Sequence, residues 1–155
     1  MKHSAIRKRF EQHLRSKSLK FTSQRDRIFE LAFNTHQHFT ADTLHEWLKG
    51  QEGAPVSRAT VYRTLHLLVE GGFIASLDAG RGELVYEHVL GHAHHDHLVC
   101  LDCGKIEEFR CEEIERLQEN AADSRGFTLL HHTLRLEGYC RNCARKHPAS
   151  AGQAG

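Results

Sequence analysis

Two pairs of cysteines share the spacing C-x-x-C: Cys100 with Cys103, and Cys140 with Cys143. With 36 residues between them, the pairs supply four thiolates, enough to fill the tetrahedral shell of a zinc ion. A shell without an open position predicts a structural site and not a catalytic one. The other interpretation, a thioredoxin-like redox dithiol, needs only one pair and a βαβ context that the sequence lacks. Cys111 has no such partner and is expected at a helix start.

A second group of possible metal ligands lies in the run from His92 to His97 (His-Ala-His-His-Asp-His). Side chains of an extended segment alternate between faces, so His95 and His97 share one face and His94 and Asp96 share the other. Two ligands per face are too few for a divalent ion. The available completions are Glu87, Glu107, Glu108, Glu115, His36, His38, His131 and His132. A solvated histidine-rich loop is the plainer alternative.

The same run also matches the H-x-H-x-D-H pattern of metallo-β-lactamase-like hydrolases, in which two ions activate water. That fold needs a four-layer body larger than 155 residues and further ligands far downstream. It also has no use for the helical N-terminal half described next. A dinuclear metallohydrolase is therefore the alternative from another functional class.

Four amphipathic helices are expected before Gly72, because apolar residues recur at helical spacing. Their apolar faces contain Ile6, Phe10 and Leu14; Ile28, Leu31 and Ala32; Leu44, Trp47 and Leu48; and Val61, Leu65, Leu68 and Val69. Thr22 or Ser23, Thr40 and Ser57 are the expected helix starts. Strand-like runs 73–77 and 84–88 follow, joined by the turn-rich tip 78–82. Helix, turn, helix and hairpin together predict a winged helix.

The C-terminal half is expected to mix strands and one helix. Strands are predicted at 98–101, 106–109 and 127–137, with a helix that turns Ile114, Leu117 and Ala121 inward. The fold class is thus α+β: an N-terminal winged helix-turn-helix domain and a C-terminal α/β domain with a four-cysteine zinc site. The expected boundaries are 1–88 for the winged helix, 89–93 for a hinge, 94–145 for the second domain and 146–155 for a disordered tail.

The helix from Ser57 to Gly71 would be the recognition helix, with Arg58, Tyr62, Arg63 and His66 facing outward into a DNA major groove. Residues 1–72 contain 12 Lys and Arg against 7 Asp and Glu, whereas residues 73–155 contain 9 against 13. The basic residues expected to meet phosphates are Lys2, Arg7, Lys8, Arg9, Lys17, Lys20, Arg25 and Arg27. The alternative is an ordinary bundle helix with an exposed polar face.

Composition limits the remaining classes. A chain of 155 residues with 39% hydrophobic and 26% charged residues is neither a large multi-domain enzyme nor a fully disordered polymer. No apolar run approaches the roughly 18 residues needed to span a bilayer, and the N-terminus lacks the apolar core of a secretion signal. We expect a soluble, cytoplasmic protein without a membrane partner.

Three segments resemble the ferric uptake regulator family: Arg58–Leu65 (RATVYRTL), His94–Lys105 (HHDHLVCLDCGK) and the closing Cys140-x-x-Cys143. The resemblance extends from about Leu19 to Cys143. It implies a homodimeric winged-helix repressor with a C-terminal dimerisation domain, which binds operator DNA when a divalent metal is bound. The additional basic N-terminal residues and the tail after Cys143 depart from the family pattern without touching a matched ligand.

The resemblance also implies roles for individual residues. Structural zinc would be bound by Cys100, Cys103, Cys140 and Cys143. The regulatory site would comprise His38, Glu87, His95, His97 and Glu108, and an auxiliary site His94, Asp96, Glu115 and His132. The DNA-binding residues would be Lys20, Arg25, Arg58, Thr60, Tyr62 and Arg63. Among these, Lys20 matches a minor-groove lysine of the family. The family residue that matches Tyr62 packs on thymine methyl groups, and the one that matches Arg63 contacts the backbone or a base.

The family also contains zinc, manganese, nickel and peroxide sensors, so the regulatory metal must be argued. Peroxide sensors tend to have Asp in place of Glu87 and Glu108, and zinc sensors commonly add a thiolate near Glu87; neither feature is present. A shell of His and Glu suits Fe2+ or Mn2+, although Zn2+ binds such ligands more tightly and availability must decide. We predict Fe2+ and the control of iron uptake genes.

Overall fold

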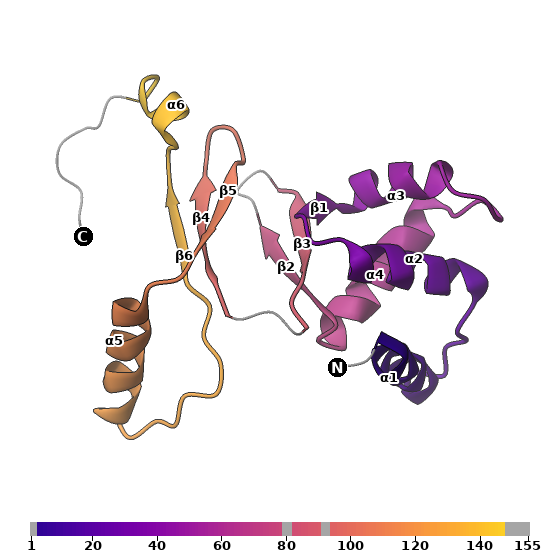
Figure 1. The fold of residues 1–155 in the computed structure, drawn as a ribbon, viewed down its shortest axis with the longest axis horizontal. Coiled ribbons are helices and arrows are strands. Elements are labelled where there is room, and N and C mark those ends of the chain that lie inside the picture. Colours follow the sequence, from indigo (N-terminus) through magenta and orange to yellow (C-terminus); the bar gives the residue numbers. More distant parts are fainter. Residues whose placement is uncertain (1–2, 79–81, 91–93, 148–155) are drawn as a thin grey trace. The chain divides into compact units, whose positions relative to one another are not determined.

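The computed structural model describes residues 3–78, 82–90 and 94–147, which form two compact units (Figure 1). Among these residues, the N-terminal unit runs from His3 to Leu90 and the C-terminal unit from His94 to His147. None of the helices in the described ranges is long and apolar enough to cross a lipid bilayer. The predicted wing tip and hinge lie partly outside these ranges, at 79–81 and 91–93.

The N-terminal unit has four helices and a small antiparallel sheet. The helices are α1 (His3–Ser16), α2 (Ser23–Asn34), α3 (Ala41–Lys49) and α4 (Arg58–Glu70). The strands β1 (Phe39–Thr40), β2 (Ile74–Asp78) and β3 (Leu84–His88) pair in the order β1-β3-β2. This arrangement confirms the predicted winged helix.

Three helix starts of this unit follow from the residues at their N-caps. The side chains of Thr22, Thr40 and Ser57 accept hydrogen bonds from backbone N–H groups three residues ahead, at the starts of α2, α3 and α4. Gly72 follows α4 with a φ of 68°, a left-handed conformation that glycine adopts without strain. The chain therefore turns from α4 directly into the first long strand of the hairpin.

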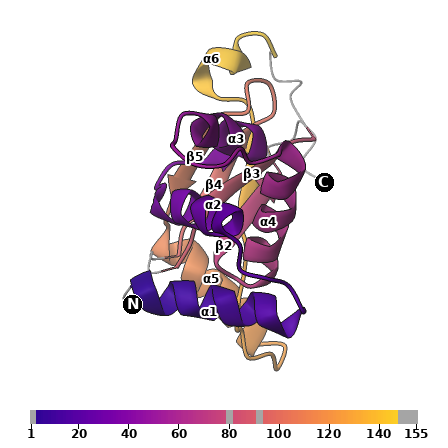
Figure 2. The same ribbon diagram turned by 90° about the vertical axis from the view of Figure 1, so that its right-hand side faces the viewer.

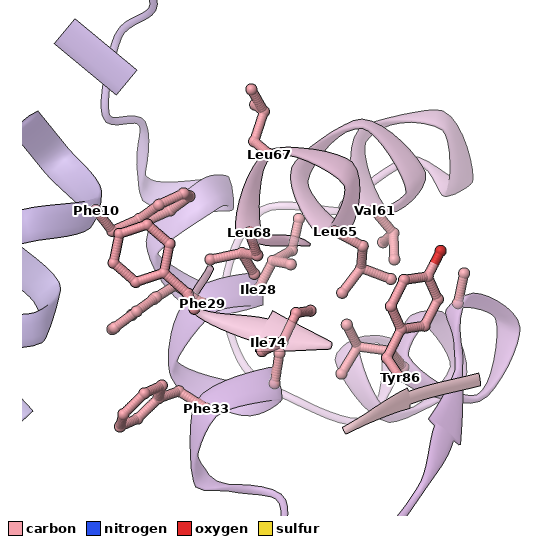
Figure 3. Packing of buried hydrophobic residues seen from close by; sticks show 14 of the residues in the cluster. Phe10, Ile28, Phe29, Phe33, Val61, Leu65, Leu67, Leu68, Ile74 and Tyr86 are labelled. Carbon is pink, nitrogen blue, oxygen red and sulfur yellow. The ribbon is translucent and has the colours of Figure 1, made fainter. Parts of the chain in front are cut away.

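The core of the N-terminal unit lies between the helices and the sheet, as Figure 3 shows for Phe10, Phe29, Leu68 and Ile74. Phe10 brings α1 into this core, because its ring stacks on Phe29 with centroids 5.4 Å apart. Figure 2 shows α1 passing beneath α2 and α4. One face of α4 therefore packs in a continuous apolar cluster.

The C-terminal unit is a three-stranded sheet with one helix beyond each end of the strands (Figure 1). The strands β4 (Asp96–Cys100), β5 (Ile106–Phe109) and β6 (Arg135–Gly138) have the order β5-β4-β6. β4 pairs with β5 antiparallel and with β6 parallel. The helices are α5 (Glu112–Asp123) and α6 (Arg141–Ala144), so the α+β fold class is confirmed.

Two predictions for this unit are wrong within the described chain. The strand expected at 127–137 is reduced to β6, because residues 127–133 have no strand of the described chain to pair with. The face of α5 that should turn inward is not buried, and Leu117 is 64% exposed. Lys146 and His147, at the start of the predicted tail, both form ion pairs with Asp102, and residues 148–155 lie outside the described ranges.

Candidate metal centres and nucleic-acid interface

The four paired cysteines come together at one end of the C-terminal sheet. Cys100 ends β4 and Cys140 follows β6, and the parallel pairing of these strands places Cys100 opposite Gly138. The four Sγ atoms all lie within 4.8 Å of one another, and none of the four cysteines forms a disulfide bond. The Sγ atoms of Cys103 and Cys140 are 3.8 Å apart. This donor set fits a tetrahedral zinc ion.

Backbone N–H groups prepare this cluster for a cation. They lie at Cys103 and Cys140 and lower the pKa of Cys100 to about 6, because they stabilise its thiolate. The N–H of Cys140 donates to Cys100 Sγ at 3.3 Å. The pKa of Cys143 is raised, first because its thiol donates to the Asp102 carboxylate and second because of burial. Four adjacent thiolates repel one another, so full ionisation of the cluster requires a bound cation.

A second cluster lies wholly within the C-terminal unit and contains His94, Asp96, Glu115 and His132, with ligand atoms within 4.8 Å of one another. His94 Nε2 is 3.2 Å from Asp96 Oδ1, and His132 Nε2 is 3.1 Å from Glu115 Oε2. Asp96 is 1% exposed, and its Oδ2 has no hydrogen-bond partner among the described residues. A buried carboxylate oxygen in this state fits a cation ligand.

The residues predicted for the regulatory site form one group in each unit. In the N-terminal unit, His38 precedes β1 and Glu87 lies in β3, and their Nε2 and Oε2 atoms are 3.2 Å apart. In the C-terminal unit, His97 of β4 pairs with Glu108 of β5, and His95 Nε2 is 3.8 Å from Glu108 Oε1. The N-terminal unit therefore contains a pair of these ligands, and the C-terminal unit contains the other three.

The alternation of ligands along 94–97 is confirmed. The rings of His95 and His97 are 5.0 Å apart, whereas His94 and Asp96 belong to the other cluster. Two of the proposed completions have other surroundings, since Glu107 forms an ion pair with Lys105 and His131 is exposed outside the cluster of His94.

Helix α4 presents the predicted reading side chains to solvent. Tyr62 is 41% exposed and Arg63 is exposed, with its Nε donating to the carbonyl of Ala59 at 3.2 Å. Thr60 is half-buried and its hydroxyl contacts Ser57 Oγ, so it takes part in the N-cap of the helix. Arg58 is exposed but forms a bidentate ion pair with Asp42 of α3.

Several basic residues expected to meet phosphates are already paired within the protein. Arg7 forms a bidentate ion pair with Asp26, and Lys17 pairs with Glu70. Arg25 donates to the carbonyl of Lys20, and Arg27 donates to the carbonyls of Ala54 and Leu48. Arg7 and Lys17 are thus paired with acidic residues distant in sequence, whereas Arg25 and Arg27 donate to backbone carbonyls. Lys20 itself is exposed.

Residues 16–137 match the Ferric uptake regulator family. The chain is 37% identical over 144 residues to the ferric uptake regulation protein of Campylobacter jejuni subsp. jejuni, covering 92% of this chain and 91% of that protein. It is similar to the solved ferric uptake regulator of Helicobacter pylori, described as having three functional metal binding sites, with a TM-score of 0.79, 25% identity and 97% of each chain covered. The Francisella tularensis regulator, solved with iron, gives a TM-score of 0.69 at 33% identity, over 81% of this chain and 94% of that one.

Proposed function

Because the chain belongs to the ferric uptake regulator family, a family of metal-responsive transcription regulators, we propose that it is an iron-responsive repressor. In this proposal it binds operator DNA as a homodimer when Fe2+ occupies the regulatory site, and it controls iron uptake genes in the cytoplasm. The observation that carries the proposal is the pairing of His38 with Glu87 beside the winged helix, while His95, His97 and Glu108 gather in the other unit.

The regulatory site would use both groups together. One ion bound by His38 and Glu87 on one side and by His95, His97 and Glu108 on the other would fix the orientation of the two units. A divalent ion supplies only charge and directed coordination in this role. The recognition helices of a dimer fit successive major grooves only when they are about one helical turn apart, or a multiple of it. Ligands engaged in that arrangement alone would therefore raise its population.

The donor types favour iron or manganese over the soft metals. Imidazole and carboxylate ligands without a thiolate suit Fe2+ and Mn2+, and the cysteines nearest in sequence to His97 belong to the four-cysteine cluster. Zn2+ binds the same His/Glu set more tightly, so the choice depends on which metal is available. The similar Francisella regulator was solved with iron, which supports Fe2+ here. A manganese, zinc or peroxide sensor of the same family is the alternative.

The exposed apolar residues of the C-terminal unit support a homodimer. Phe127 and Leu130 are 71% and 81% exposed, and α5 buries none of its residues. A large apolar surface on a small domain favours association with another protein surface. A second copy of this unit would cover α5 and pair with residues 127–133, which belong to no strand of the described chain.

The four cysteines and the His94 cluster complete the proposal. We assign structural Zn2+ to Cys100, Cys103, Cys140 and Cys143, whose donor set is closed to substrate. The cluster of His94, Asp96, Glu115 and His132 is assigned as the auxiliary site. Neither assignment gives the protein a catalytic role, and no observation favours the dinuclear hydrolase.

Metal analysis combined with metal-resolved DNA binding tests this function. Protein purified without chelator should contain about one zinc per chain that survives mild chelation. Under anaerobic conditions, added Fe2+ should then allow the protein to enrich a discrete sequence from a random duplex library. Enrichment that proceeds equally with chelator present, or only with Zn2+, would contradict the assignment of Fe2+ as the signal.

A further inference from the structure

Arg58 stands in the first turn of the recognition helix but is held by another helix. Its Nε donates to Asp42 Oδ1 at 2.6 Å and its Nη2 donates to Asp42 Oδ2 at 2.7 Å. Asp42 lies in the first turn of α3, which is not part of the expected DNA-reading surface. A bidentate pair fixes the plane of the guanidinium as well as its position.

The fixed guanidinium lies against Tyr62, one turn further along α4. Its central carbon is 5.5 Å from the centroid of the Tyr62 ring, within the range of a cation–π contact. Arg58 Nη2 also lies 3.4 Å from the Tyr62 hydroxyl, to which it donates. Asp42, Arg58 and Tyr62 thus form a chain of contacts that ends on an exposed aromatic ring.

This arrangement alters what Arg58 does for DNA binding. An unpaired arginine on this exposed face could contact a phosphate, and a phosphate contact strengthens binding to every sequence alike. Here the Asp42 carboxylate occupies two of its donors and cancels its charge at short range. The pair is solvent-exposed, with side chains 62% and 47% accessible, so its contribution to folding stability is small.

We infer that Asp42 is a positioning residue for sequence discrimination, which acts by holding Arg58 against Tyr62 and away from phosphates. Tyr62 is thereby presented in one orientation, and general affinity for DNA is kept low. The inference rests on the proposed DNA-binding function. It assigns Arg58 a bracing role in place of the direct DNA contact expected from sequence.

The test compares Asp42→Asn with wild type in the full-length, Mn2+-loaded protein. The probes are the duplex that the wild-type protein enriches from a random library and a shuffled duplex of the same composition. Released Arg58 should tighten binding to the shuffled duplex and steepen its salt dependence by about one unit of slope. The ratio of the two affinities should fall by about fivefold or more as Tyr62 loses its support.

Three further variants separate this role from simpler ones. Glu46→Gln removes a carboxylate from the same helix, where Glu46 pairs with Lys49 and not with Arg58, and it should leave the affinity ratio unchanged. In an Arg58→Ala background, Asp42→Asn should have no further effect on the ratio. Asp42→Glu, which keeps a carboxylate, should restore most of the discrimination.

An unchanged ratio in Asp42→Asn would overturn the inference, as would an equal fall in the Arg58→Ala background. A fall in affinity for both duplexes together, with a lower melting temperature, would also overturn it, since that pattern indicates a merely structural role. If the wild-type protein enriches no duplex at all, the proposed function itself fails, and that result is visible before any variant is made.

Discussion

The two units of this protein are stabilised in different ways. The N-terminal unit buries a large apolar cluster that includes Phe10, Phe29 and Leu65, each fully inaccessible. In the described part of the C-terminal unit, the buried apolar side chains are Val99, Cys100 and Cys143, and two of these three are candidate metal ligands. A core of that size is too small to stabilise a domain, so we expect the second unit to depend on zinc and on a second copy.

The comparison also separates the sources of function. The N-terminal unit, which has a sufficient core of its own, is the self-sufficient unit. It carries the side chains expected to read DNA, on the exposed face of a helix whose other face is in the core. The C-terminal unit, the dependent unit because it is expected to need zinc and a second copy, carries most of the candidate metal ligands. A domain that folds only when metal and partner are present is suited to report on them, because binding free energy becomes folding free energy.

Removal of one zinc ligand should break the dependent unit while sparing the other. Cys100→Ser removes a buried thiolate from a site expected to contribute on the order of 10 kcal/mol of apparent binding free energy. We expect loss of zinc and of the dimer together, with helical protection retained in residues 3–90. Metal analysis, light scattering and hydrogen exchange measure the three outcomes.

Cys111→Ser is the matched control for that change. Cys111 occupies the N-cap of α5, where its side chain makes no capping hydrogen bond, and it lies outside the four-cysteine cluster. This variant should keep its zinc and its dimer. A Cys100→Ser protein that remains a folded dimer would show that the C-terminal unit has a sufficient core of its own.

His38→Ala tests whether the N-terminal unit depends on the C-terminal unit for its response to metal but not for its folding. The variant should keep fold, zinc and dimer but lose Fe2+- or Mn2+-dependent operator binding. A shift from about 1% to 99% competent dimer would need roughly 5.5 kcal/mol of differential metal binding, and a loss of that order is expected if His38 is an essential ligand. A mobility-shift titration with Mn2+ as an air-stable surrogate measures it.

His94→Ala and His132→Ala should have smaller effects in the same titration, because both residues belong to a cluster within one unit. His131→Ala, a change at an exposed histidine next to that cluster, is the control for removing an imidazole. Full activation of the His38 variant by Mn2+ would exclude the proposed bridge between the units.

Phe10→Ala should destabilise the N-terminal unit by about 3–5 kcal/mol, since it empties the space between α1 and α2. Phe10 also contacts Phe73, which directly precedes β2, with ring centroids 5.3 Å apart, so the loss extends to the base of the hairpin. Calorimetry of the zinc-loaded dimer should show that the unfolding temperature of the N-terminal unit falls, while the zinc-dependent unfolding of the C-terminal unit keeps its temperature. A single transition that shifts as a whole would mean that the two units unfold together.

Local features of the sequence were sufficient to predict much of this organisation. Thr40 and Ser57 mark their helices through N-cap chemistry, and the alternation along 94–97 follows from strand geometry. The cysteine spacing likewise led to a four-sulfur cluster. These predictions succeeded because each depends on residues close together in the chain or on a motif with a fixed geometry.

Features that depend on distant partners were missed. Only the last part of the strand expected at 127–137 forms, as β6, because the described chain offers no pairing strand for the residues before it. Leu117 is exposed because no other part of the described chain covers it. The pairs Arg7–Asp26 and Arg58–Asp42 join residues 19 and 16 positions apart, and no local pattern marks either acid as a partner.

Tyr62→Ala should have the smallest effect on the protein and the most selective effect on its function. Tyr62 is outside the core, so the melting temperature, the zinc content and the metal dependence of binding should stay at wild-type values. A base contact is worth about 1–3 kcal/mol of discrimination, so the preference for the selected duplex over a shuffled one should fall by that amount at fixed salt. An unchanged preference would place sequence reading elsewhere than on this face of α4. A loss of discrimination with unchanged stability would show that the exposed face of α4 determines sequence specificity independently of the core and of the metal sites.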